Sequence, residues 1–202
     1  LPLLIWAFKE TGVSSYLEVA KYQAETSRKY LIREDFSTYH TFDFDTTTNE
    51  PIAGRTWQGY ADESCWSRGQ SWALHGFAQL YLLLGDESYL ETSAKLADYV
   101  KSVITPDLVP VWDYRLPASE IQYKDSSAGA VTAAGLLALA EGLTRAGQKE
   151  RAAEYREFGL AMLKALRDTC DISTKQGSQG FLAHGASHVA LAQQKNLPNY
   201  AD

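Results

Sequence analysis

The stretch "LLGDESYLETSA", Leu83–Ala94, joins two apolar patterns of helical spacing through a short turn. Gly85 lies where a helix ends in the left-handed conformation, and a second pattern begins two or three residues later. Similar turns occur in "KETGVSSYLEVA", Lys9–Ala20, and, as the weakest match, in "TRAGQKERAAEY", Thr144–Tyr155. Their glycines at positions 12, 85 and 147 are 73 and 62 residues apart. This regular return of one turn predicts a repeat of helical hairpins.

Apolar residues at helical spacing predict six helices. Ser14 or Ser15 is expected to cap the second helix, and Asp62–Ser64 to cap the third. Sustained strand alternation is absent, although "VPVWDY", Val109–Tyr114, is compatible with one short strand. The expected helices are Leu1–Glu10, Ser14 or Ser15 to about Arg33, Ser64–Leu84, Asp86–Ile104, Ser126–Arg145 and Lys149–Arg167.

Three long connections separate the hairpins: Glu34–Glu63, Thr105–Asp125 and Asp171 to about Leu191. If the hairpins stack side by side, the short turns share one end and the long loops share the other. Long loops are usually functional, so a site is expected at the long-loop end. Six helices in three hairpins fit part of a closed ring, a freestanding bundle or a solenoid, and the pattern alone does not choose among these.

Composition narrows the classes of function. Apolar residues make up 45% and charged residues 22%, as in an ordinary soluble globular protein. No apolar run approaches the roughly eighteen residues of a membrane span, so no membrane partner is expected. The net charge is −6 and no basic stripe occurs, so nucleic acid is not expected to bind. Two cysteines far apart, Cys65 and Cys170, favour free buried thiols.

The loop "DFSTYHTFDFDTTTNEPIAGRTWQGYADES", Asp35–Ser64, is unusually rich in aromatic residues. Aromatic faces with interleaved short polar side chains suit a sugar pocket. The same aromatics would equally anchor a long loop onto the helices, and composition does not separate the two interpretations. The aromatics concerned are Phe36, Tyr39, Phe42, Phe44, Trp57 and Tyr60.

The adjoining stretch "WQGYADESCWSRGQSW", Trp57–Trp72, places Arg68 and Trp72 four residues apart on one helix face. Arg68 falls in the first turn of its helix, where the helix dipole disfavours a cation. A carboxylate partner is therefore expected. The pattern alone favours an internal Asp or Glu as this partner over a ligand.

The remaining polar candidates carry weaker signals. In "HGASH", His184 and His188 have the spacing of two metal ligands but lack a third, so no metal or cofactor is predicted. His75, in mid-helix, is interpreted as a satisfied core residue. In "KDSSAGAV", Asp125 stands at a helix start, where an N-cap is its expected role. A second role for Asp125 at the site is left open.

Several of these stretches together resemble the unsaturated glucuronyl hydrolases of glycoside hydrolase family 88. They run in family order over nearly the whole chain, and "QGYADESCWSRGQSW" is the most specific. The stretches are "LPLLIWAFKETG", "STYHTFDFD", "WQGYADESCWSRGQSWALHGFAQLY", "DSSAGAV", "GFLAHGASH" and "NYAD".

The resemblance implies an all-α fold, an (α/α)6 barrel of six hairpins, of which this chain covers roughly the central to C-terminal helices. It also implies a bacterial enzyme of glycosaminoglycan degradation, either cytoplasmic or periplasmic. Its substrate is an anionic oligosaccharide, produced by a lyase, whose terminal uronate carries a C4=C5 double bond. An Asp acid protonates C4, water adds at C5, and the hemiketal opens to release the sugar.

By resemblance, His40, Gln58, Arg68 and Trp72 fall on substrate-binding positions, with Arg68 toward the uronate carboxylate. The family's catalytic Asp pair is expected before Leu1, so no catalytic residue is assigned in this chain. Residues 1–202 are therefore interpreted as one barrel domain, incomplete at both ends and inactive alone. None of the acidic side chains of the loops is nominated as the acid: Asp43, Asp45, Asp62 or Asp125.

Two alternatives stay open at this point. A related group acts on unsaturated rhamnogalacturonan fragments and shares an R-G-x-x-W element, although the longer "ADESCWSRGQSW" favours the glucuronyl group. A non-catalytic sugar-binding or structural protein of helical hairpins is the second alternative. The family's sulfate-recognising pattern, Ser-x-x-Ser-x-Lys, is not evident in "SHVALAQQK", which contains only Ser187. The resemblance therefore implies no preference for a sulfated substrate.

Overall fold

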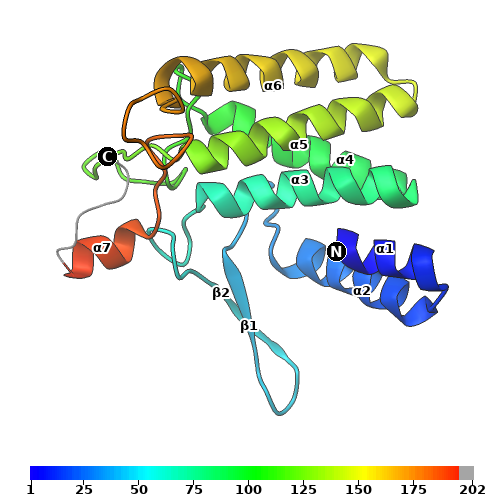
Figure 1. The fold of residues 1–202 in the computed structure, drawn as a ribbon. Helices are drawn as coiled ribbons and strands as arrows, with labels where there is room; N and C mark the ends of the chain where they lie inside the picture. The colour runs from blue at the N-terminus through cyan, green and yellow to red at the C-terminus, as the bar shows by residue number, and fades with distance from the viewer. Residues whose placement is uncertain (196–202) are drawn as a thin grey trace.

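Three helical hairpins, a β-hairpin and a short last helix make up the computed structural model, which describes residues 1–195 (Figure 1). The stretch "NYAD" lies outside the described residues. The helices are α1 (Pro2–Thr11), α2 (Ser14–Tyr30), α3 (Ser67–Leu84), α4 (Glu87–Val103), α5 (Ser126–Arg145), α6 (Lys149–Cys170) and α7 (Val189–Lys195). The strands are β1 (Thr41–Phe44) and β2 (Pro51–Arg55).

The repeated glycines adopt the left-handed conformation that the turns require. Gly12, Gly85 and Gly147 have φ of 71°, 75° and 78°, values that residues with a Cβ rarely adopt. The predicted cap of the second helix is wrong, because Val13 precedes α2 and no side chain caps it. The turns nevertheless join α1 to α2, α3 to α4 and α5 to α6, so the hairpin repeat is confirmed.

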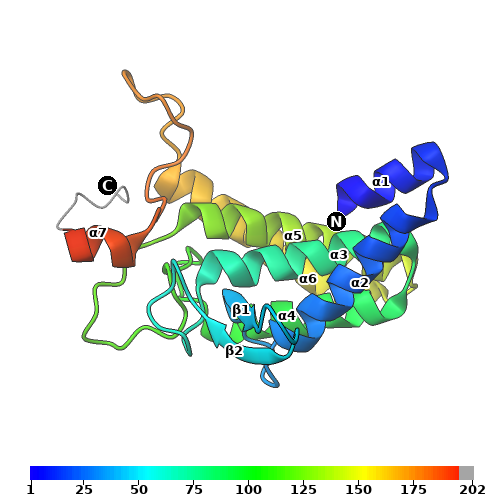
Figure 2. The ribbon, with the colours of Figure 1, turned by 90° about the horizontal axis from the view of Figure 1, so that it is seen from below.

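The short turns and the long loops lie at opposite ends of the helices, as alternating connection lengths predict. Figures 1 and 2 place the loops before α3 and α5, and the segment between α6 and α7, at one end. The turns α1–α2 and α5–α6 lie at the other end. The long-loop end therefore brings together residues that are far apart in the sequence.

The core forms where α3, α4 and α5 meet, with α6 packed on the outside of α5. Gly135 permits the close approach of α5 to α3: a Cβ there would lie 2.3 Å from Leu74 Cδ2. By length and composition alone α5 would suffice to cross a membrane, but 56% of its apolar window is buried within this protein. The position of α5 in the core, in contact with α3, α4 and α6, therefore explains its apolar sequence. Side chains that are completely buried in this core include Leu74, Leu96, Val100, Leu136, Leu139 and Leu143.

The loop after α2 contains a β-hairpin that the sequence did not predict. Strands β1 and β2 pair antiparallel, with Phe42 opposite Gly54 and an irregularity after Asp43. The rings of Phe42 and Phe44 lie 5.2 and 5.0 Å from the ring of Tyr30 on α2. These aromatics therefore anchor the loop to the helices, as one of the two interpretations of this loop proposed.

The start of α3 differs from its predicted position. The helix begins at Ser67 after Trp66, with no side-chain cap. Asp62 instead accepts a hydrogen bond from Thr56 N at 2.9 Å and pairs with Arg55. The Asp62 carboxylate, which the pattern assigned to the N-cap of α3, is therefore bound by Arg55 and Thr56 instead.

The stretch "VPVWDY" forms no strand but only single bridges. Trp66 pairs with Asp113, and Val111 pairs with Lys124. Cys65 and Cys170 are both buried and free, as predicted.

Candidate functional site

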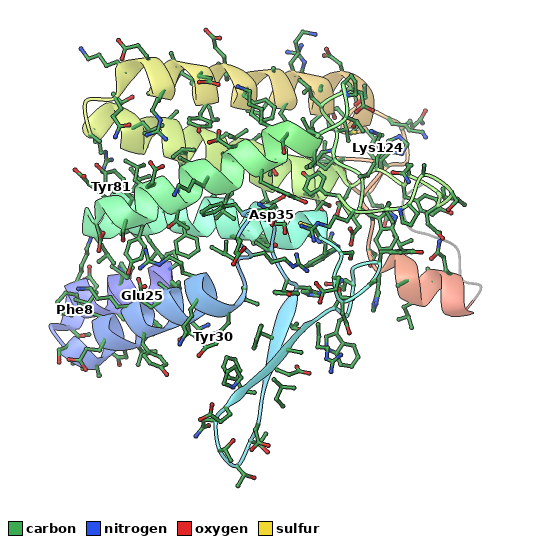
Figure 3. The ribbon with its side chains drawn as sticks, turned by 180° about the vertical axis from the view of Figure 1, so that it is seen from behind. Phe8, Glu25, Tyr30, Asp35, Tyr81 and Lys124 are labelled. Carbon is green, nitrogen blue, oxygen red and sulfur yellow. The ribbon has the colours of Figure 1, made fainter. Side chains whose placement is uncertain are left out.

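The connection between α2 and α3 carries His40 and Gln58, and Arg68 lies in the first turn of α3. The start of α3 is at the long-loop end, where Figure 3 labels Lys124; Tyr81 lies toward the opposite end. His40 is the residue immediately before β1. Its Nδ1 accepts hydrogen bonds from the backbone N–H groups of Trp57 (3.1 Å) and Gln58 (3.2 Å). The proton of the neutral imidazole is therefore on Nε2, which is left as a donor. The loop that leads into α3 thus wraps around His40.

Burial lowers the pKa of His40 below its usual value of 6.5, and the neighbouring His188 and Arg68 lower it further. Trp66 lies against His40, with ring centroids 4.3 Å apart, and the Arg68 guanidinium lies 4.9 Å from the Trp66 ring. The Trp66 ring is thus shared by His40 and Arg68. Its position in the tryptophan-rich stretch was the only sequence signal for this role.

Arg68 has the carboxylate partner that its place in the first turn of α3 predicts. Its Nη1 lies 3.6 Å from Asp125 Oδ2 and donates to Ser127 Oγ at 2.7 Å. Its Nη2 donates to the backbone carbonyls of Ala186 (2.8 Å) and Ser187 (2.9 Å). The internal carboxylate that the pattern favoured is therefore Asp125, which also caps α5 as predicted.

The residues His184–His188, named here the covering segment, contact this site from the far end of the chain. Gln58 Nε2 donates to Ser187 O at 3.1 Å, and His188 Nε2 lies 2.5 Å from Trp57 O. Ala186 and Val189 pack against Trp112, which anchors the segment. In each of these polar contacts the oxygen belongs to a backbone carbonyl, which every residue has. No residue pattern in the sequence therefore indicates them.

His184 and His188 have the spacing of two metal ligands, and a metal site there would require a third ligand near them. Within residues 1–195, no group of three or more His, Cys, Asp and Glu side chains is placed to hold a metal ion. His188 instead contacts the loop before α3.

Trp72 lies one helical turn after Arg68 on α3, but within residues 1–195 it makes no hydrogen bond or ring contact with the other three predicted residues. Its side chain is 55% exposed and lines an apolar cavity of about 200 Å³ between α2 and α3. In the described part of the chain, its one ring contact is with His75, at 6.2 Å. His75 is half-buried, so its interpretation as a core residue holds only in part.

Asp113 organises the loop that carries Gln58, and sequence analysis missed it. Its carboxylate is completely buried and accepts hydrogen bonds from four donors. The only sequence signal was an Asp in the otherwise apolar "VPVWDY". The donors are Tyr60 N (3.0 Å), Ser64 Oγ (2.5 Å), Cys65 N (3.0 Å) and Arg115 N (2.9 Å).

Comparison with known proteins identifies the family. The family model described as Glycosyl Hydrolase Family 88 matches residues 1–183. An unsaturated glucuronyl hydrolase from Bacillus sp. strain GL1 is 38% identical over 189 residues, which is 94% of this chain and 50% of that protein. An unsaturated chondroitin disaccharide hydrolase from Streptococcus pneumoniae is 38% identical over 67% of this chain and 34% of that protein. The chain thus spans at most about half the length of these two relatives.

Solved structures agree with this match. The crystal structure of the Bacillus sp. GL1 unsaturated glucuronyl hydrolase superposes with a TM-score of 0.89 at 37% identity, over 95% of this chain and 50% of that one. A mutant unsaturated glucuronyl hydrolase from Streptococcus agalactiae, complexed with dGlcA-GalNAc6S, superposes with a TM-score of 0.80 at 28% identity, over 98% of this chain and 52% of that one. These neighbours are (α/α)6 barrels, so the predicted fold class is confirmed. The chain belongs to Glycosyl Hydrolase Family 88.

Proposed function

We propose that the full-length protein carrying these residues is an unsaturated glucuronyl hydrolase. Its substrate is a lyase-generated oligosaccharide whose terminal uronate has a C4=C5 double bond. The reaction adds a proton at C4 and a hydroxyl at C5, and the resulting hemiketal opens to release the next sugar. The family match over residues 1–183 carries this proposal.

The site residues can supply the binding half of this chemistry. The Nε2–H of His40 is a donor for a sugar hydroxyl or for the attacking water, and the Gln58 amide is a second polar group beside it. The Arg68 guanidinium is the cation for the uronate carboxylate. To bind it, Nη2 would exchange the carbonyls of Ala186 and Ser187 for carboxylate oxygens. Charge-assisted hydrogen bonds are stronger than those to neutral carbonyls, which favours the exchange.

The general acid is expected from outside these residues. A general acid must hold its proton near the working pH, whereas hydrogen bonds to the carboxylate form keep a group ionised. Backbone hydrogen bonds from Thr48 and Thr47 hold the pKa of Asp45 below its usual range. The Arg55 guanidinium does the same for the pKa of Asp62. Asp43 also pairs with Arg55, at 3.5 Å. Asp45 and Asp62 are therefore poor candidates for the general acid.

The test follows the ultraviolet absorbance of the double bond. The full-length protein should remove this absorbance from unsaturated disaccharides of chondroitin or heparin, with unsaturated rhamnogalacturonan fragments as the comparison substrate. Sulfated and unsulfated disaccharides are assayed in parallel, since the chain shows no clear sulfate-recognising pattern. Absorbance that stays constant on every glucuronyl substrate would refute the proposed reaction, and turnover of rhamnogalacturonan alone would favour the related group.

Arg68→Ala in the full-length enzyme is expected to raise KM and weaken uronate binding by about 2 to 3 kcal/mol, as the loss of a charged hydrogen-bond partner does. Arg151→Ala is the matched control, since Arg151 pairs with Glu91 on the α4–α6 side, away from the loops. Unchanged KM and kcat in the Arg68 variant would show that Arg68 has only a structural role.

A further inference from the structure

Asp125 is a helix cap whose burial exceeds what a cap requires. Its Oδ1 accepts hydrogen bonds from Ser127 N (3.1 Å), Ser127 Oγ (2.5 Å) and Ala128 N (3.3 Å). Its side chain is completely buried, and Oδ2 has no hydrogen-bond partner among the described residues. A buried carboxylate oxygen is costly unless a positive group compensates it. Capping therefore accounts for one oxygen of Asp125 and leaves the other to be explained.

Asp86, at the start of α4, shows what capping alone looks like in this fold. It accepts a hydrogen bond from Ser88 N at 2.9 Å, as Asp125 does from Ser127 N, but it is exposed. Asp86 lies in the short turn that joins α3 to α4. Both residues cap a helix, but of the two only Asp125 is buried and has a cationic nitrogen within 4 Å of its carboxylate.

That cation is Arg68. Its Nη1 lies 3.6 Å from Asp125 Oδ2, and the arginine side chain is 18% exposed. Ser127 bridges the pair, because its hydroxyl donates to Asp125 Oδ1 and accepts from Arg68 Nη1 at 2.7 Å. The hydroxyl is thus oriented by both charged groups.

Lys124, the neighbour of Asp125 in the chain, does not compete for the carboxylate. Its Nζ contacts Asp107 at 2.6 Å and Val109 O at 3.0 Å. Figure 3 shows Lys124 in the loop before α5. Arg68 is therefore the cation that the structure pairs with Asp125.

We propose that Asp125, with Ser127 as its bridge, is a positioning residue that fixes the Arg68 guanidinium for the uronate carboxylate. This inference rests on the proposed function. Nη2 faces the covering segment, where it would exchange two backbone carbonyl oxygens for the carboxylate oxygens of the substrate. Nη1 would meanwhile keep its contacts with Asp125 and Ser127. A guanidinium held on one side loses less conformational freedom when substrate binds on the other side.

The test uses Asp125→Asn in the full-length enzyme. Asn caps helices about as well as Asp, so the variant keeps the cap and removes only the charge. We expect KM for the unsaturated disaccharide to rise about tenfold, or about 1.4 kcal/mol, with a smaller change in kcat. Asp86→Asn, the matched cap variant, should leave KM and kcat unchanged.

A double-mutant cycle separates positioning from a general effect on the fold. If Asp125 acts through Arg68, Asp125→Asn should raise KM in the unsubstituted enzyme but not in the Arg68→Ala enzyme. An equal rise in both backgrounds would overturn the inference, as would an unchanged KM in the Asp125 variant. Should Asp125→Asn fail to fold, Ser127→Ala is measured in the same two backgrounds and judged by the same criterion.

The unsubstituted enzyme is assayed first, so that the two failures stay distinct. An inactive full-length enzyme would refute the proposed function and the inference together. An active enzyme in which Arg68→Ala raises KM and Asp125→Asn does not would refute the inference alone.

Discussion

Replacing Asp113 by alanine is expected to destabilise the protein by about 4 kcal/mol, a large share of the stability of an ordinary domain. The substitution removes the acceptor of four hydrogen bonds, from Tyr60 N, Ser64 Oγ, Cys65 N and Arg115 N. Each orphaned buried donor costs about 1 to 1.5 kcal/mol once water reaches the vacated space, which gives about 4 to 6 kcal/mol. Relief from burying the carboxylate offsets about 1 to 2 kcal/mol of this.

The assay is urea unfolding of the full-length protein. Ser64→Ala removes one of the four hydrogen bonds, at 2.5 Å, and should cost about 1 kcal/mol. Asp168→Ala, which removes exposed ion pairs with Lys164 and Arg167, should leave the free energy of unfolding unchanged within error. If Asp113→Ala costs no more than Ser64→Ala, the four contacts do not act together and the reasoning is wrong.

Three further outcomes are expected. Gly135→Val should cost about 3 kcal/mol in urea unfolding, because a Cβ at this position already lies 2.3 Å from Leu74 Cδ2, whereas Gly76→Ala, with nothing within 4 Å, should not destabilise. Burial lowers the pKa of His40 below 6.5, so the unfolded chain binds the proton first and stability is lost as pH falls through 6.5. His40→Asn should show a smaller loss between pH 7 and pH 5, and an unaltered pH dependence would contradict this. Trp72→Ala should raise KM with little loss of stability, since the ring is 55% exposed, and a large drop in Tm with unchanged KM would assign it to the core instead.

The hairpins were predictable because their turns depend on local backbone conformation. Gly12 and Gly85 end their helices at positive φ, a conformation that favours glycine, so the glycine itself marks the turn in the sequence. Helix bounds were less predictable, because capping residues compete for tertiary partners. Asp62 was expected at the start of α3, but Arg55 and Thr56 occupy its carboxylate. The β-hairpin escaped prediction since its alternating stretch, Thr41–Phe44, has only four residues.

The candidate site was predictable in kind and only partly in detail. A first-turn cation indicates a carboxylate partner, and Arg68 has one, but nothing local singles out Asp125, 57 residues away, as that partner. Substrate binding by His40, Gln58, Arg68 and Trp72 stays a prediction. The place of the covering segment at the long-loop end was predicted, but its individual contacts were not, because backbone carbonyls are its main acceptors and every residue has one.

The covering segment sets the order in which the protein matures during synthesis. Each helical hairpin joins neighbouring stretches and can form as soon as its two helices leave the ribosome. The contact of His188 with Trp57 spans 131 residues, so it waits until most of this chain has been made. Nascent chains that stop short of residue 184 would carry the hairpins with Arg68 open to solvent on its Nη2 side. Completion of the site is therefore a late event in synthesis.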